Sequence, residues 1–230
     1  MSRQKQPVTT ELILNGAALP PQLTSTTTET GGSPAVTQGN GSVALTLDAT
    51  SEPQAAVLYQ GDKLAFDIDD LQSVEIVAEL DAEPGAEVSV GLGVCSAQND
   101  TLDSIAEGAF FRLDAGSLAV KIETDDGTTD KDDVETGVTL TAATPTKFRI
   151  NFRDGIQHRV GANSLGGKAA VQFALDNAQG NLRPVNLNGT IMDMSAYSGR
   201  LQLFAQIAKA SGTAAGTLTI HSIKVEHLAY

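Results

Sequence analysis

The 230-residue sequence has no tryptophan and few other aromatic residues, which together make up 4% of the chain. Aromatic side chains supply large, rigid apolar surfaces for the binding of small ligands, sugars among them. Their scarcity argues against a deep small-molecule pocket and against a platform on which sugar rings stack. It does not exclude a structural or interaction role.

Positive charge and cysteine are also scarce. Lysine and arginine number 15 against 28 aspartates and glutamates, so the net charge is −13. An acidic surface repels nucleic-acid phosphates and anionic membranes, and we therefore expect neither as a partner. Cys95 is the only cysteine, which excludes an intramolecular disulfide and a cysteine-based zinc cluster. It follows an apolar strand pattern, so we expect a buried, unreactive thiol. The sequence also lacks the roughly 18-residue apolar run of a membrane-spanning helix.

Composition divides the chain into residues 1–41 and residues 42–230. The first part is rich in Thr, Gly, Pro and Ser, and its two basic and two acidic residues balance, so the whole negative excess lies in the second part. Residues 1–41 carry too few apolar side chains to fold alone. They form either a flexible leader or an extended arm that becomes ordered along a partner subunit. The short apolar segment 12–14 is too brief for a secretory signal.

From residue 42 onward, apolar and polar residues alternate with the period of half-buried β-strands. A change of phase between Ile220 and Ile223 predicts a β-bulge near His221 and Ser222. Residues 83–86 suit a type II turn, Asp154-Gly155 is a hairpin signal, and residues 102–107 are the one short helical candidate. The pattern predicts an all-β, antiparallel two-sheet sandwich. The alternating segments are 43–47, 64–68, 74–80, 88–94, 118–122, 148–152, 171–175, 201–207 and 218–225.

Several segments resemble the strand formulas of concanavalin-like jelly rolls, in the versions found in tailed-bacteriophage virion proteins. The resemblance spans roughly residues 55–226, and the segments that carry it are 66–75, 109–113, 147–155, 199–204 and 216–220. It implies a jelly-roll domain over residues 42–230, preceded by an extended N-terminal arm over residues 1–41. No catalytic or ligand motif of the family is matched.

The same resemblance implies a non-enzymatic capsid cement or decoration protein, made in the host cytoplasm and located on the capsid surface of the virion. Its partners would then be the major capsid protein and further copies of itself, with a trimer slightly favoured. Two alternatives stay open: a carbohydrate-binding or host-adhesion module of a phage fibre or spike, and a glycoside hydrolase. Fold alone does not decide among them.

The candidate for hydrolytic chemistry is the segment Glu79-Leu80-Asp81-Ala82-Glu83, which resembles the nucleophile and acid/base motif of concanavalin-like β-glucanases. Alternate residues share one strand face, so three carboxylates would line a sheet at the spacing of a retaining glycosidase. Pro84 and Gly85 follow at once and place Glu83 in a turn, and there is no tryptophan to stack a sugar. A solvated strand end is the competing interpretation.

Three other features carry weaker chemical hypotheses. Residues 123–135 hold seven acidic residues and one lysine, which suits either a Ca²⁺-binding loop or, as we prefer, a solvated loop. His158, His221 and His227 match no metal-ligand spacing. Gly91 and Gly93 share a strand face and indicate close approach, either of a partner or of the chain's own interior. We therefore expect no catalytic residue, no metal site and no cofactor.

Overall fold

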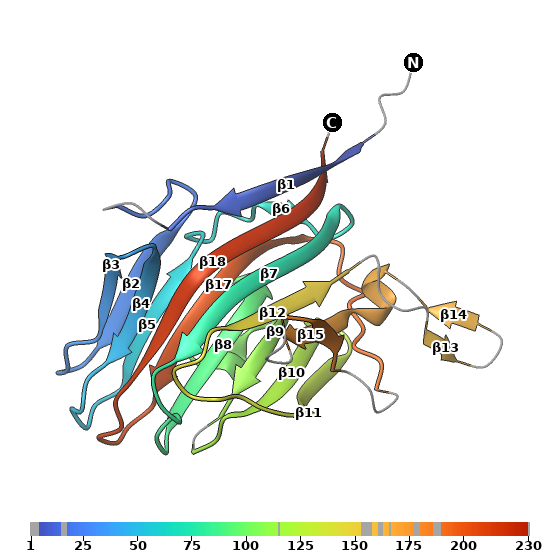
Figure 1. Ribbon diagram of the computed structural model, residues 1–230. Coiled ribbons are helices and arrows are strands. Elements are labelled where there is room, and N and C mark those ends of the chain that lie inside the picture. Colours follow the sequence, from blue (N-terminus) through green and yellow to red (C-terminus); the bar gives the residue numbers. More distant parts are fainter. Residues whose placement is uncertain are drawn as a thin grey trace.

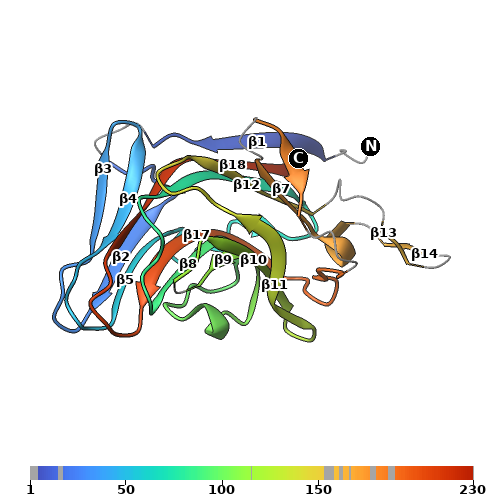
Figure 2. The ribbon, with the colours of Figure 1, turned by 60° about the horizontal axis from the view of Figure 1, so that its bottom comes forward.

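The computed structural model describes residues 5–14, 18–114, 116–152, 158–160, 163–165, 167–176, 180–185 and 190–229. Two antiparallel sheets face each other and form a jelly-roll sandwich, as predicted from the sequence (Figures 1 and 2). The helical structure in the described residues consists of two short 3₁₀ turns, η1 (Leu102–Ser104) and η2 (Gly167–Ala170). No helix among these residues is long and apolar enough to cross a membrane.

Sheet A is centred on β7 and the long last strand β18, which pair over most of the length of β7. Its strands in spatial order are β16 (Leu182–Pro184), β15 (Gln172–Asp176), β12 (Thr146–Asn151), β7 (Leu71–Leu80), β18 (Gly216–Ala229), β4 (Ser42–Leu47) and β3 (Ala35–Gly39). The strand β1 (Gln6–Leu12) pairs with the C-terminal half of β18.

Sheet B is centred on β17 and β8, which pair over eight residues. Its strands in spatial order are β11 (Asp130–Thr139), β10 (Ala119–Asp126), β9 (Glu107–Leu113), β8 (Val88–Cys95), β17 (Arg200–Lys209), β5 (Gln54–Tyr59) and β2 (Thr24–Glu29). The short β6 (Phe66–Asp67) pairs with the start of β17, and β13 (His158–Val160) and β14 (Asn163–Leu165) form a separate hairpin.

The main core lies between the two sheets and is built from the alternating apolar residues that the sequence pattern identified. Val43, Leu45 and Leu47 of β4 in sheet A are each at most 1% exposed, and Val90, Leu92 and Val94 of β8 in sheet B join the same core with equally low exposure. At one end of this core, Phe111 contacts Phe148 and Phe173 in edge-on geometry, with ring centroids 5.1 and 5.0 Å apart. Alternation therefore located the buried faces correctly.

The predicted division at residue 41 does not separate an arm from a body in the described residues. Strands β1, β2 and β3 all belong to that segment, and they pair with β18, β5 and β4 of the same chain. Leu12, Leu14 and Leu23 are 4–6% exposed and join the main core. The correction has a physical reason. A segment too polar to fold alone still gains backbone hydrogen bonds when it completes ladders of sheets that already have a core.

Local predictions had mixed outcomes. The bulge at His221 is confirmed, because the β18–β7 register shifts between Ile220 and Ser222. The turn predicted at 83–86 is displaced, since the hydrogen bond from Val88 N to Gly85 O closes a turn over 85–88. The helical segment shortens to η1, and β9 already begins at Glu107. The Asp154-Gly155 hairpin signal lies outside the described residues.

A candidate ligand site in the hollow of sheet B

Both sheets curve in the same sense, so the outer face of sheet B is the hollow side of the molecule (Figure 2). Strand alternation decides which side chains reach that face. On β8 the valines and Leu92 point into the core, and the intervening Ser89, Gly91, Gly93 and Cys95 point outward. The side chains in the middle of this concave face are therefore small and rise little above the backbone.

The segment 96–106, which contains η1, lies across this face and covers its middle. Leu102 and Ile105 pack there on Phe110 and Phe204, whose rings meet edge-on at 5.5 Å. A methyl group at Gly91 would approach Leu102 Cδ2 to 2.5 Å. Of the two interpretations of the strand glycines, internal close packing is therefore confirmed at Gly91. A methyl group at Gly93 would likewise meet the backbone of β9, so both glycines lie against other residues of the chain.

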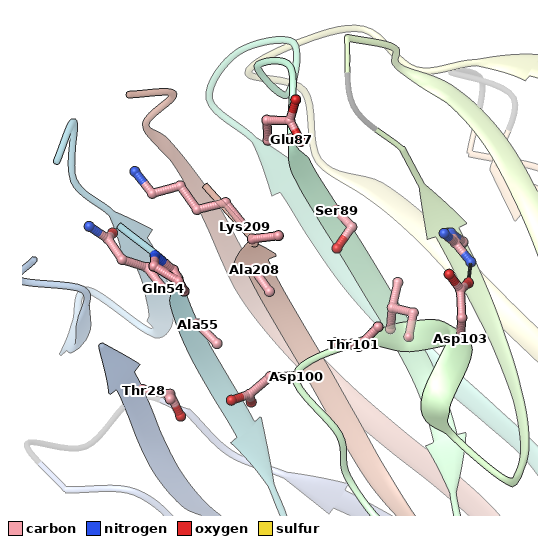
Figure 3. A pocket seen from close by; sticks show the side chains of 14 residues that line it. Thr28, Gln54, Ala55, Glu87, Ser89, Asp100, Thr101, Asp103, Ala208 and Lys209 are labelled. Carbon is pink, nitrogen blue, oxygen red and sulfur yellow. Dashed lines mark hydrogen bonds and ion pairs between the residues drawn. The ribbon is translucent and has the colours of Figure 1, made fainter. Parts of the chain in front are cut away.

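Beside this segment a hollow of about 410 Å³ remains open (Figure 3). Its floor consists of the buried Ala55 of β5 and Ala208 of β17, which are 1% and 4% exposed. Polar side chains surround this apolar floor. They comprise the hydroxyls of Thr28, Ser89 and Thr101 and the carboxylates of Glu87, Asp100 and Asp103.

The wall beside β5 and β17 is held by fixed hydrogen bonds. Lys209 Nζ donates to the backbone oxygens of Asp48, Thr50 and Ala214 at 2.6–2.9 Å, so its charge is engaged by the loops. Gln54 binds Asp48 through both ends of its amide, at 2.5 and 3.0 Å. Lys209 and Gln54 are thus held in place, and the hydroxyls, Glu87 and Asp100 are the polar groups of the hollow that these contacts do not use.

Asp100 is itself positioned by two glutamine side chains. Gln98 Nε2 donates to Asp100 Oδ1 at 3.0 Å, and Gln206 Nε2 donates more weakly to the Asp100 backbone oxygen at 3.4 Å. One carboxylate oxygen of Asp100 is thus used internally. The group is half-buried, and its side chain points toward the hollow.

The opposite wall is formed by Arg112 and its acidic neighbours. Arg112 bonds Asp103, binds Asp114 at 2.5 Å, and reaches Glu123 Oε1 at 2.8 Å. Glu123 is 3% exposed. Burial raises its pKa to about 7, Arg112 opposes this rise, and the carboxylates of Asp133 and Asp132 add to it. Glu123 is therefore a carboxyl group that titrates near neutrality beneath the surface.

The acidic residues 123–135 form a hairpin rather than a loop. Strands β10 and β11 continue to Asp126 and from Asp130, so only a short turn separates them. Burial and the neighbouring carboxyl of Asp132 raise the pKa of Asp130 to about 6. In the described part of the chain, no three His, Cys, Asp or Glu side chains are arranged to hold a metal ion. The calcium hypothesis thus has no geometric support there.

The Glu-x-Asp-x-Glu segment lies on the other sheet. Glu79 belongs to β7 of sheet A and faces His221 at 3.4 Å. Asp81 accepts a hydrogen bond from Thr217 N at 2.9 Å beyond the end of β7, and Glu83 is exposed before Pro84. The geometry fits the solvated strand end and not the glucanase motif, because the strand ends at Leu80 and the three carboxylates do not line one sheet face.

The remaining sequence candidates do not converge. His221 and His227 lie six residues apart on β18, and the side chain of His158 is outside the described residues. Cys95 is fully buried, and burial raises the pKa of its thiol, in agreement with an unreactive cysteine. Sequence reasoning missed Ala55, Ser89 and Asp100. The polar run 98–100 between two strands was the only local signal, and the alanine floor joins residues 153 positions apart in the sequence.

Comparison with known proteins identifies solved structures that have a similar fold. No protein-family model matches the chain, and none of the curated proteins matches it. Among solved structures, it resembles the Emp47p carbohydrate recognition domain, with a TM-score of 0.58, 11% identity, and 94% of each chain covered.

It also resembles the catalytic domain of an endo-1,3-β-glucanase from Thermotoga petrophila RKU-1, with a TM-score of 0.59, 11% identity and 98% of each chain covered. A protein of unknown function, SO2946 from Shewanella oneidensis MR-1, gives a TM-score of 0.59 at 10% identity, with 100% of this chain and 90% of that chain covered. At such low identity these likenesses establish the jelly-roll fold alone. None of the three is described as a component of a virion.

Proposed function

We propose that the protein is a carbohydrate-binding module that holds a saccharide in the hollow of sheet B without cleaving it. The observation that carries the proposal is the preformed, 410 Å³ hollow with an alanine floor and a polar rim. The likeness to a carbohydrate recognition domain and to a glucanase catalytic domain supports it, since both carry a saccharide-related name on the same fold.

The chemistry of the rim suits a saccharide. A sugar presents hydroxyls that both donate and accept, and the hydroxyls of Thr28, Ser89 and Thr101 do the same. The free oxygen of Asp100 adds a charged acceptor, which makes shorter and stronger hydrogen bonds than a neutral one. Ala55 and Ala208, which are 1% and 4% exposed, make the bottom of the hollow apolar, and the C–H face of a sugar ring is apolar too.

The site supports saccharide binding alone better than it supports saccharide hydrolysis. Glycosidases need two carboxyl groups on either side of the scissile bond, about 5–9.5 Å apart. The two carboxyls whose pKa is raised to about 7 and about 6, Glu123 and Asp130, do not line the hollow, and Glu123 is also covered and engaged by Arg112. The absence of an aromatic side chain from the lining predicts weak binding, because stacking on aromatic rings is not available.

The capsid-cement hypothesis remains a sequence-based prediction. Its mechanism required residues 1–41 to become ordered on the major capsid protein, whereas strands β1, β2 and β3 are paired within the chain. A host-adhesion role on a fibre or spike is compatible with saccharide binding and needs no free arm. We therefore place the carbohydrate-binding alternative first.

A glycan array followed by titration calorimetry tests the proposal. We expect the wild-type chain to bind a restricted set of saccharides, and the double variant S89A/D100A to lose at least tenfold in affinity. The matched control is Glu79→Gln on the outer face of sheet A, which removes one carboxylate far from the hollow and leaves binding unchanged. Absence of any saccharide binding, or equal binding by S89A/D100A, would overturn the proposal. Saccharide cleavage that Glu79→Gln abolishes would restore the hydrolase alternative.

A further inference from the structure

The strand orders of the two sheets end at β16, β3, β11 and β2, and these four strands differ in how they are protected against pairing with another strand. The β11 edge carries four acidic residues and one lysine, so a second copy would meet a net negative charge there. The β16 edge is only three residues long and ends in Pro184, which cannot donate to a ladder. Charges, proline and short length are the usual protections of sheet edges.

The β2 edge has none of these protections. Its sequence is Thr-Ser-Thr-Thr-Thr-Glu, with no proline, no lysine and a single charge at the last position. Within the described residues its ladder hydrogen bonds go only to β5, so every second residue directs its N–H and C=O away from the sheet. Its side chains bury little, since five are exposed and Thr26 is half-buried. The β3 edge of sheet A, also uncharged, lies on the same side of the molecule (Figure 1).

We propose that β2 pairs antiparallel with β2 of a second copy of this chain, around a twofold axis that passes close to Thr26 or Thr27. Opposite residues of an antiparallel ladder share the same hydrogen-bonding direction, so a symmetric pair must be centred on one residue. Centred on Thr26, the ladder places Thr24 opposite Thr28 and Ser25 opposite Thr27. Cross-strand threonine pairs are favourable, and Glu29 does not face its own copy.

The distribution of charge favours the β2 edge as the place where a second copy binds. The chain carries a net charge of −13, and its acidic hairpin is at the other end of sheet B. Residues 1–41, which include both β2 and β3, have no net charge. The side formed by these two strands is therefore the one on which two identical acidic molecules approach with the least repulsion.

The pairing has a consequence that rests on the proposed saccharide binding. A twofold axis that relates antiparallel strands in one continuous sheet is perpendicular to that sheet, so both hollows open to the same side. Thr28 lines the hollow and also belongs to β2, which places the interface at its rim. Two weak sites on one face would bind a surface that displays repeated saccharides much more tightly than one site does.

Sedimentation and light scattering on the full chain test the pairing. We expect a species of about twice 23.9 kDa for the wild type and a monomer for T26D/T27D, in which the carboxylates of the two copies face each other. The T26K/T27K variant is expected to be monomeric alone and to form a mixed dimer with T26D/T27D. The control T141D/T144D adds the same charge at exposed positions outside the strands and should stay dimeric.

Circular dichroism shows whether the variants are folded. The mixed dimer is a second check, because T26D/T27D and T26K/T27K can form it only if both variants are folded. A monomeric wild type at 100 µM, or a T26D/T27D variant that remains dimeric, would overturn the pairing. Saccharide binding is judged separately. If both proposals hold, we expect dimer and monomer to bind a soluble monovalent saccharide with equal affinity per site. We also expect the monomer to bind a saccharide-coated surface more weakly than the dimer does. A dimer that binds no saccharide refutes only the proposed function.

Discussion

Replacing Glu123 by glutamine should change the pH dependence of stability in a way that can be calculated. The carboxyl is 3% exposed, and its pKa is about 7 in the folded protein against 4.5 for an unperturbed glutamate. The folded state therefore holds a proton that the unfolded state releases, between about pH 4.5 and pH 7. Stability contributed by this group is complete below pH 4.5 and is lost as the pH rises through 7.

A pKa difference of this size corresponds to about 3 kcal/mol. Glutamine keeps the shape and can still accept a hydrogen bond from Arg112, but it does not titrate. We expect the unfolding free energy of E123Q relative to wild type to increase by about 3 kcal/mol between pH 4 and pH 8. Urea denaturation at several pH values measures this difference. The control is Glu135→Gln, an exposed position on the neighbouring strand. Its unfolding free energy should differ from that of the wild type by less than about 0.5 kcal/mol at each pH. A wild-type to E123Q difference that stays constant with pH would refute this reasoning about burial.

Two further predictions address the fold. Leu14→Ala should cost about 2–5 kcal/mol, because Leu14 is 4% exposed in the main core, whereas Ile13→Ala, at 60% exposure, should change stability by less than about 0.5 kcal/mol. Equal, small effects in chemical denaturation would mean that the N-terminal segment is not packed on the sandwich. Gly91→Ala should destabilise by about 1–3 kcal/mol through its clash with Leu102, and adding Leu102→Ala should lower the cost of the glycine substitution. Additive effects in the double-mutant cycle would contradict the contact.

Sequence patterning was sufficient for the strands that bury one face. The alternation of β4, β7, β8 and β17, and the phase change that marks the bulge at His221, all follow from side chains facing one core. It failed for β5, whose run Gln-Ala-Ala-Val-Leu is buried on both faces and does not alternate. It also failed for β2 and β11, which are edge strands whose exposed polar side chains carry no burial signal.

The candidate site was less predictable than the fold. The acidic motifs drew attention because charged residues are conspicuous in a sequence, but Glu79 faces His221 on sheet A and Glu123 is covered beside Arg112. The hollow instead depends on residues with small side chains. Ala55 and Ala208 become a floor only because β5 and β17 pair, with Ala55 opposite Ala208 in the register. Pairing between distant segments of this kind is not encoded in any local spacing.

The most direct test of the central claim is a crystal structure of the protein with the saccharide that binds best on the array. We predict density for the sugar over Ala55 and Ala208, with hydrogen bonds to Asp100 and to the hydroxyl of Ser89 or Thr28. Density on the outer face of sheet A, or a saccharide that leaves the hollow of sheet B empty, would contradict the account.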